Sequence, residues 1–257
     1  MNATRLAVRR DRVDTGTRAV AEEVPVAFTY GRTTYAVMMA TPDDLEDFAY
    51  GFSFTEGVAA PHEIAELEIV RHPKGVELRM ALCDGRDVAL MNRRRKLAGP
   101  VGCGLCGVES LEAAIAPVRR VQSDVRISRD EIFDALGKLG THQTLNRETR
   151  AVHGAGFWPI GAKDYRAVRE DVGRHNALDK LCGALGCEAQ GGMVVLTSRV
   201  SIEMIQKSAA MNAPIVTAMS APTALAIETA QEAGITLTAV ARDDGFEVFT
   251  HPERIRT

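Results

Sequence analysis

Cys103 and Cys106, three positions apart, are the residues of this chain whose types and spacing point most directly to chemistry. They lie in GPVGCGLCGVES (99–110), a stretch rich in glycine. A CxxC pair can supply two zinc ligands, form a redox couple, or present a nucleophilic sulfur to another molecule. The backbone freedom of the glycines suits a loop that carries a sulfur atom between two places, although it also permits a tight turn.

A zinc site is the first alternative. A structural site needs about four Cys or His ligands, and Cys182 and Cys187 are the available partners. Their separation is looser than that of a zinc knuckle, and cysteines of this kind are more often simply buried. A zinc deaminase requires H-x-E before P-C-x-x-C, but His153 is followed by Gly154 and Ala155 and comes after the cysteine pair. We therefore expect no structural metal.

A thiol redox couple is the second alternative. The thioredoxin-type pair opens a helix after a strand, which lowers the pKa of its first thiol. The glycine-rich surroundings here differ from that context. The basic run RRRK (93–96) could favour a thiolate or persulfide, although such a run is more often a solvated face. The redox alternative stays open at this stage.

Composition limits the cellular setting. The 257 residues carry 31 Lys+Arg and 34 Asp+Glu, a formal net charge of −3, which gives no general attraction to nucleic acid or membrane. No apolar run approaches the ~20 residues of a membrane span. We expect a cytoplasmic protein with reduced thiols, no nucleic-acid partner and a loose basic arm at residues 1–19.

Residues 20–122 have the pattern of an α+β domain. Two strands, 24–30 and 33–40, are predicted around a turn at Gly31-Arg32, and a second pair at 64–71 and 76–82. Between these pairs, TPDDLEDFAYGFSFTEG (41–57) predicts a helix that Thr41 caps and Gly57 ends.

Residues 123–257 predict an α/β domain with a parallel sheet. The apolar runs 193–198, 214–219 and 235–241 alternate with helices that start near Ser201 and Thr223, which is typical of βαβ units. Ser128 and Glu131 form a capping-box pattern for an earlier helix that Gly140 could close. A further helix is expected at about 176–185.

Ligands of open α/β sheets bind beyond the carboxyl ends of the strands, where helix N-termini favour phosphate. Here small hydroxyl side chains and one guanidinium gather at two such ends, which predicts a phosphate-bearing ligand. The alternative is that these residues cap helices. The candidates are Thr197, Ser198, Arg199, Ser201, Ser220 and Thr223.

EDVGRHNALDK (170–180) lies at another expected strand-to-helix junction, and we expect its side chains to point toward the same edge of the sheet. Asn176 with Asp179 is a good helix cap, so a structural role is favoured for both. Arg174 and His175 precede the cap and are candidates for binding, because an arginine there can hold phosphate and a histidine titrates near neutrality.

Four stretches, in this order, closely resemble the formate dehydrogenase accessory sulfurtransferase family, FdhD: MMATPDDLEDFAYGFSFTEG, GCGLCG, EDVGRHNALDK and SAPTALAIETA. The resemblance runs from about residue 20 to the C-terminus. It implies a sulfur carrier that accepts sulfane sulfur from a cysteine desulfurase. The acceptor would be the molybdenum or tungsten bis-guanine-dinucleotide cofactor, before it enters the formate dehydrogenase apoenzyme. Cys103 matches the persulfide-forming position and Cys106 its partner.

The resemblance also implies a cytidine deaminase-like three-layer αβα domain joined to a smaller α+β domain, and a homodimer. Mo-bis(molybdopterin guanine dinucleotide) would be a bound substrate, with GDP or GTP as its mimic. The cofactor-binding stretch of the family falls on Phe246, Glu247, Val248, Phe249, Thr250 and His251, which composition alone predicts as an edge strand. Two other functions remain open: a non-catalytic cofactor-binding chaperone and a thiol oxidoreductase.

Overall fold

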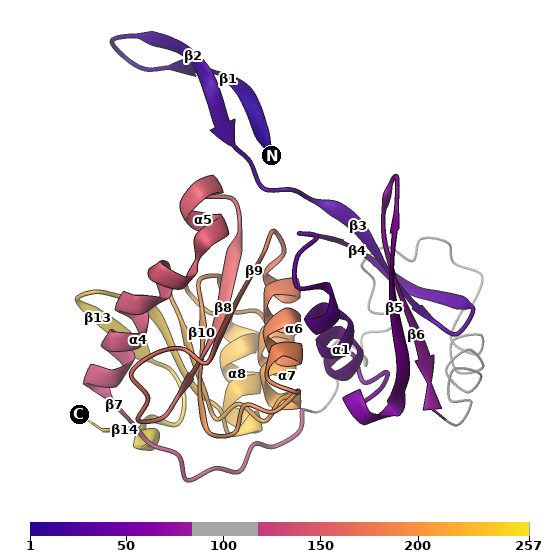
Figure 1. Cartoon of the computed structure of the whole chain (residues 1–257). Coiled ribbons are helices and arrows are strands. Elements are labelled where there is room, and N and C mark those ends of the chain that lie inside the picture. Colours follow the sequence, from indigo (N-terminus) through magenta and orange to yellow (C-terminus); the bar gives the residue numbers. More distant parts are fainter. Residues whose placement is uncertain (84–117, 257) are drawn as a thin grey trace.

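The computed structural model describes residues 1–83 and 118–256, which form two packed parts and a projecting hairpin (Figure 1). Cys103, Cys106 and the loop around them lie outside the described residues, as does the basic run 93–96. Across the described ranges, no helix is both long enough and apolar enough to cross a membrane.

The first part is a four-stranded sheet of order β4-β3-β6-β5 with one helix on its face. The strands are β3 (Val24–Tyr30), β4 (Thr33–Ala40), β5 (Ile64–His72) and β6 (Gly75–Leu82), close to the predicted bounds. A short 3-10 turn, η1 (Pro61–Glu63), precedes β5. Phe28 of β3 is fully buried and stacks on Phe52 with ring centroids 3.9 Å apart.

The helix of this part, α1 (Leu45–Thr55), starts later than predicted. Its N-cap is Asp44, which has a left-handed φ of 52° and makes no side-chain cap. Thr41 therefore does not cap it; instead its hydroxyl accepts a hydrogen bond from the Val172 N–H, 3.2 Å away in the second part. The predicted cap is replaced by a contact between distant segments.

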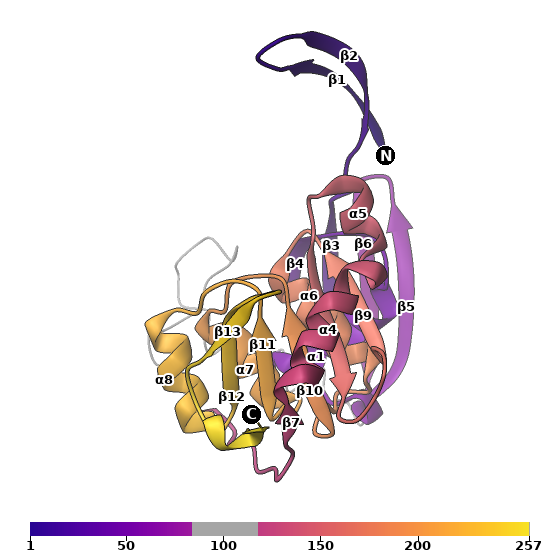
Figure 2. The same ribbon diagram turned by 90° about the vertical axis from the view of Figure 1, so that its left-hand side faces the viewer.

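The N-terminal arm is a β-hairpin rather than a loose segment. Strands β1 (Asn2–Val8) and β2 (Val13–Ala19) pair antiparallel and stand apart from the body of the molecule in both views (Figures 1 and 2).

The second part is built on a six-stranded sheet of order β13-β12-β11-β10-β8-β9. The predicted parallel trio is confirmed by β10 (Gly192–Leu196), β11 (Ile215–Ala218) and β12 (Thr236–Arg242). On one side β13 (Gly245–Val248) pairs antiparallel with β12. On the other, β8 (His153–Pro159) and β9 (Ala167–Asp171) extend the sheet through antiparallel pairs.

Helices cover both faces of this sheet, which gives three layers and confirms the α/β class. Side chains alternate along β10: Val194 packs with the cluster of α6 (Arg174–Ala184), α7 (Ile202–Ala210) and α8 (Ala224–Ala233), whereas Met193 and Val195 pack toward α4 (Arg129–His142). The short α5 (Thr144–Thr149) follows α4, and the small elements β7 (Ile127–Ser128), η3 (Pro252–Arg254) and β14 (Ile255–Arg256) lie near the C-terminus. Helices α7 and α8 begin as predicted, next to Ser201 and Thr223.

Two other predicted helix boundaries differ. Ser128 caps α4 by accepting from the Glu131 N–H at 3.2 Å, as predicted, but the helix continues past Gly140 to His142. Helix α6 begins at Arg174, with Gly173 as its N-cap, so Asn176 lies inside the helix and is not the cap.

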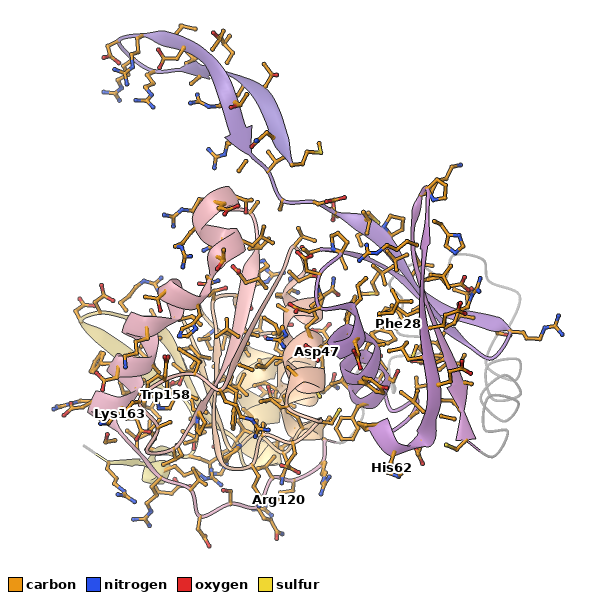
Figure 3. All side chains as sticks on the ribbon, in the orientation of Figure 1. Phe28, Asp47, His62, Arg120, Trp158 and Lys163 are labelled. Atoms are coloured by element: carbon orange, nitrogen blue, oxygen red, sulfur yellow. The ribbon has the colours of Figure 1, made fainter. Side chains whose placement is uncertain are left out.

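The two parts meet where α1 lies alongside α6, at a pair of glycines. A Cβ on Gly51 would lie 1.7 Å from the Asp179 carbonyl oxygen, and one on Gly183 would lie 2.0 Å from the Asp47 carbonyl oxygen. Close backbone approach is possible there because neither residue has a side chain. Asp47 lies on α1 at this contact (Figure 3), where its carboxylate accepts from Arg169 at 2.7 Å.

Candidate functional site

The carboxyl ends of the three parallel strands form one edge of the large sheet, the edge where ligands of such sheets bind. Short backbone bonds join the segments that follow the strands: Met219 N–H donates to Leu196 C=O at 2.9 Å, and Thr223 N–H to Val200 C=O at 2.9 Å. Because β8 is antiparallel to β10, its first residue also lies at this edge, and β9 ends there at Asp171. We call this edge the rim; it brings together 197–201, 220–223 and the start of α6.

Most hydroxyls predicted at the rim already bond to the protein. Thr223 caps α8, which agrees with the structural alternative. The Ser220 side chain and the exposed Arg199 guanidinium have no bonded partner among the described residues. The bonded hydroxyls are Thr197 from Gly154 N–H (2.8 Å), Ser198 to Arg199 C=O (3.0 Å), Ser201 to Glu203 carboxylate (2.6 Å) and Thr223 from Ala226 N–H (3.2 Å).

A cavity of about 340 Å³ opens at the rim. Its lining includes Thr197 and Ser220, two residues that the sequence predicted, and Arg242 and Asp243, which it did not. Leu136 and Met219 supply apolar walls.

Arg242 and Asp243 follow an irregular stretch of β12. Val240 has a φ of 53° where the β12–β13 register shifts, and its N–H donates to Ser220 C=O at 3.2 Å. A β-branched residue rarely adopts the left-handed region, so no sequence signal marks this bulge or the side chains that it brings to the rim.

His175, in the first turn of α6, is held neutral. Burial, then the positive charges of Arg174 and Lys207, lower its pKa to about 4, and the nearby carboxylates of Glu203 and Glu56 only partly oppose this. Its Nε2 lies 3.8 Å from the Glu203 carboxylate, beyond hydrogen-bond distance.

Two buried nitrogens at this helix start lack a protein partner among the described residues: His175 Nε2 and Arg174 Nε. Burial, and next Arg174, also lower the pKa of His153. A permanent cation therefore lies beside two imidazoles with lowered pKa values. Buried polar atoms are generally bonded to something, so the pair Arg174 and His175 is suited to a polar or anionic ligand.

We expected the other polar side chains of 170–180 to point toward the rim, but most of them bond to the first part instead. The buried Lys180 ammonium lies 2.7 Å from the Asp171 carboxylate and donates to Thr41 C=O at 2.8 Å. The Asp171 carboxylate accepts from Thr41 N–H at 3.0 Å, and the Asn176 amide donates to Met39 C=O at 2.9 Å. These residues fasten α6 to the first part.

Asp179 does the same one turn further along. Its buried carboxylate accepts from Lys207 at 2.8 Å and from the Thr55 hydroxyl at 2.6 Å, and Lys207 also donates to Glu56 at 2.7 Å. Asp179 is therefore structural, as the sequence favoured, but it joins three helices instead of capping one.

The stretch 246–251 runs along the edge strand β13 and away from the rim. Phe246 packs against Phe133 with ring centroids 5.4 Å apart, while Glu247 and Val248 are exposed. The partly buried Phe249 packs against the core of α6–α8. At the far end Thr250 is buried and bonds to Leu237 N–H at 2.9 Å.

His251 accepts at its carbonyl from the Thr236 hydroxyl at 2.9 Å, at the start of β12. The structure thus places 250–251 at the edge of the sheet opposite the rim. The 246–251 stretch and the rim residues do not form one local cluster.

Cys182 and Cys187 are buried free thiols at the end of α6. Cys187 N–H donates to Cys182 C=O at 2.9 Å and Gly186 N–H to Gly183 C=O at 2.9 Å, with Gly186 at a φ of 66°. This is a Schellman helix end, in which the first and last residues normally make an apolar contact. Packing therefore accounts for both cysteines. No metal-binding group of three or more His, Cys, Asp or Glu occurs in residues 1–83 and 118–256.

The fold and the rim define a two-part α/β protein whose larger sheet offers an anion-compatible edge beside a tightly fastened helix pair. The model of the FdhD/NarQ family matches residues 21–256. The chain belongs to this family, which confirms the resemblance found in the sequence.

Similar proteins agree over nearly the whole length. A sulfur carrier protein FdhD from Agrobacterium fabrum is 54% identical over 256 residues, covering 98% of this chain and 94% of that protein. Another from Brucella abortus is 48% identical over 255 residues, covering 97% and 94%. A solved structure, a formate dehydrogenase accessory protein from Desulfotalea psychrophila, aligns with a TM-score of 0.76 at 27% identity, covering 100% of this chain and 99% of that one.

Proposed function

We propose that this protein carries sulfur for the maturation of formate dehydrogenase, with Cys103 as the residue that bears the persulfide. The observation that carries the proposal is membership of the FdhD/NarQ family over 21–256, together with the CxxC pair that this chain contains inside that range. The names of the similar proteins, sulfur carrier and formate dehydrogenase accessory protein, support it.

The loading step is a thiol exchange without net oxidation. The Cys103 thiolate attacks the outer sulfur of a persulfide on a cysteine desulfurase; a new S–S bond forms, the donor S–S bond breaks, and the donor cysteine leaves as a thiolate. In the delivery step the Cys106 thiolate attacks the inner sulfur of the Cys103 persulfide. This forms a Cys103–Cys106 disulfide and releases the outer sulfur as sulfide. The two electrons that reduce the outer sulfur come from the two cysteine sulfurs, which are oxidised to the disulfide. The other route is relay of the outer sulfur to Cys106.

The sulfur acceptor in this proposal is the molybdenum or tungsten bis-guanine-dinucleotide cofactor, bound as substrate. Arg174, with its buried unpaired Nε, and the exposed Arg199 supply positive charge for its phosphates. A ligand with two dinucleotide arms has two distant ends, so one end occupies the rim and the other lies along 246–251. The partners are a cysteine desulfurase, the formate dehydrogenase apoenzyme and a second copy of this chain in a homodimer.

The two cysteines distinguish this proposal from its alternatives. Cys103→Ala should abolish persulfide loading by a desulfurase and formate dehydrogenase maturation, whereas Cys106→Ala should still load Cys103 but lower transfer. Mass spectrometry of the loaded proteins and formate oxidation in a strain lacking the native protein measure both effects. If Cys103→Ala and Cys106→Ala abolish persulfide loading equally, the result favours a thiol oxidoreductase. A fully active Cys103→Ala protein favours a non-catalytic cofactor-binding chaperone and removes the sulfur-carrier proposal.

Nucleotide binding at the rim is tested with GDP or GTP as mimics. Calorimetry on the full chain should show GDP binding that Arg199→Ala with Ser201→Ala weakens by about tenfold, because a charge-assisted phosphate contact is lost. Arg32→Ala, at the exposed turn between β3 and β4 of the first part, is the matched control. Unchanged binding in the rim variant would mean that the phosphates bind elsewhere.

A further inference from the structure

The hairpin of β1 and β2 is the part of the structure that the proposed function does not use. It lies before residue 21, where the family match begins, and it projects from the body in both views (Figures 1 and 2). An isolated two-stranded hairpin is at best marginally stable in water. A hairpin in this position therefore gains stability from any surface that packs on it.

The hairpin carries more positive than negative charge. Residues 1–19 contain five arginines and two aspartates. Arg5, Arg9 and Arg10 have no carboxylate partner in the described part of the chain, and Arg12 pairs only with the half-exposed Asp14 at 3.3 Å. The hairpin is thus a basic surface whose charges are largely unneutralised.

A hollow of about 620 Å³ lies between the hairpin and α5, and three arginines line it. Arg5, Arg9 and Arg18 line it, with Glu148 of α5 as its acidic member. Arg18 also donates to Thr149 C=O at 3.3 Å, which holds the base of the hairpin against α5. The lining carries a net positive charge and suits carboxylate or phosphate groups.

The hairpin also offers features that only a polypeptide can use fully. Leu6, Val8 and Val13 are 62%, 73% and 60% exposed. Val8 faces Val13 across the strands, so the three lie on one face of the hairpin. A two-stranded sheet further leaves the outer N–H and C=O groups of its strands open to another strand.

We propose that the hairpin is a docking arm for an extended acidic segment of a partner protein. The segment adds as a further strand, its carboxylates bind the guanidinium groups of Arg5, Arg9 and Arg18, and its alternate apolar side chains cover Leu6 and Val8. Nucleic acid and anionic lipid are also negatively charged, but they have no peptide backbone that could pair with a strand. The structure therefore favours a polypeptide.

The test uses the full chain and a fluorescent peptide that alternates Glu with Val. Binding should be measurable by anisotropy and should fall about tenfold or more in Arg5→Glu with Arg9→Glu, because two charge-assisted contacts are reversed. Arg32→Glu with Lys74→Glu changes the net charge equally at exposed turns of the body and should bind like the unaltered protein. Equal loss in this control would overturn the proposal, since it would show general electrostatics.

Three further probes fix the kind of partner. A peptide with the same charges but Pro in place of alternate Val should bind at least about tenfold more weakly, because proline cannot donate to a strand ladder. A single-stranded DNA oligonucleotide and phosphatidylserine vesicles should bind more weakly than the Glu-Val peptide. Equal binding of the Pro peptide, or tighter binding of DNA or vesicles through Arg5 and Arg9, would contradict docking of a protein segment. Sulfur loading of Cys103 from a small-molecule donor should be unaltered by the arm variants, which separates this inference from the proposed function.

Discussion

His175 shows how a single residue at the rim depends on its surroundings. Its sequence context predicted a titrating group near neutrality, but burial, Arg174 and Lys207 lower its pKa to about 4. The imidazole is neutral at physiological pH and can accept a hydrogen bond or proton from a ligand at one nitrogen. The guanidinium of Arg174, not His175, supplies the positive charge.

This lowered pKa has a consequence for stability. An unfolded histidine has a pKa near 6.5, above the folded value, so the unfolded state binds the additional proton as pH falls. The stability is fully present above about pH 6.5 and is lost on acidification toward pH 4. Between pH 7 and pH 5 the loss should be roughly 2 kcal/mol. Urea unfolding of the unaltered protein and of His175→Asn across this range measures it.

In His175→Asn this part of the pH dependence should disappear, so the difference in free energy of unfolding between the two proteins should change by roughly 2 kcal/mol between pH 7 and pH 5. His62→Asn, the same substitution at an exposed position, is the matched control. Parallel curves for the unaltered protein and His175→Asn would contradict a lowered pKa at this residue.

The buried ion pair of Asp179 and Lys207 makes a second prediction at the residue scale. Lys207→Met should destabilise the protein by about 3–5 kcal/mol, because it leaves the Asp179 carboxylate buried without its cation. Lys207→Met with Asp179→Asn should cost less than the sum of the single changes. Urea denaturation of all four proteins in the cycle gives the coupling. Additive costs would mean that the pair does not act as a unit.

At the scale of elements, α1 and α6 are fixed by their glycines. Gly51→Ala should raise the intrinsic helix propensity of α1 but destabilise the protein by about 3 kcal/mol, because the added Cβ meets the Asp179 carbonyl oxygen. Gly137→Ala is the matched control: it lies exposed in α4 with nothing within 4 Å. It should stabilise by about 0.5–1 kcal/mol. Thermal unfolding of both variants checks the opposite signs.

Local patterns predicted the elements well where they depend on periodicity. The hairpin of β3 and β4 and the parallel trio β10–β12 follow from apolar runs and turn residues in the sequence. Helix starts were predicted where a side-chain cap acts locally, as with Ser128 and Thr223. They were wrong at Thr41 and Asn176, because those polar groups bond across the interface between the two parts.

The candidate site, too, was predicted from the sequence only where local patterns place its residues. The rim residues 197–201 and 220–223 could be placed together because parallel strands end at one edge. The sequence could not show that β13 turns back and carries 250–251 to the opposite edge, nor that a left-handed Val240 brings Arg242 and Asp243 to the cavity. Both depend on strand pairing that local composition does not specify.

At the scale of the whole molecule, the contacts between the two parts are too extensive for the parts to behave as independent domains. α1 and α6 approach backbone to backbone at Gly51 and Gly183, and the ion pairs of Lys180 and Lys207 are each completed by groups from the first part. Separating the parts would expose these buried ammonium groups and Phe54 of α1, which packs against the core of the second part.

The two parts should therefore unfold as one cooperative unit. In urea, fluorescence of Trp158, the single tryptophan, reports the second part, and hydrogen exchange of peptides from β3–β6 reports the first. Both should give the same midpoint and the same free energy of unfolding. Lys207→Met should separate the two transitions, since the ammonium that joins Asp179 to Thr55 and Glu56 is gone. Lys74→Met, at an exposed turn, should leave them coincident. Two separate transitions in the unaltered protein would show that the interface only holds together parts that fold independently.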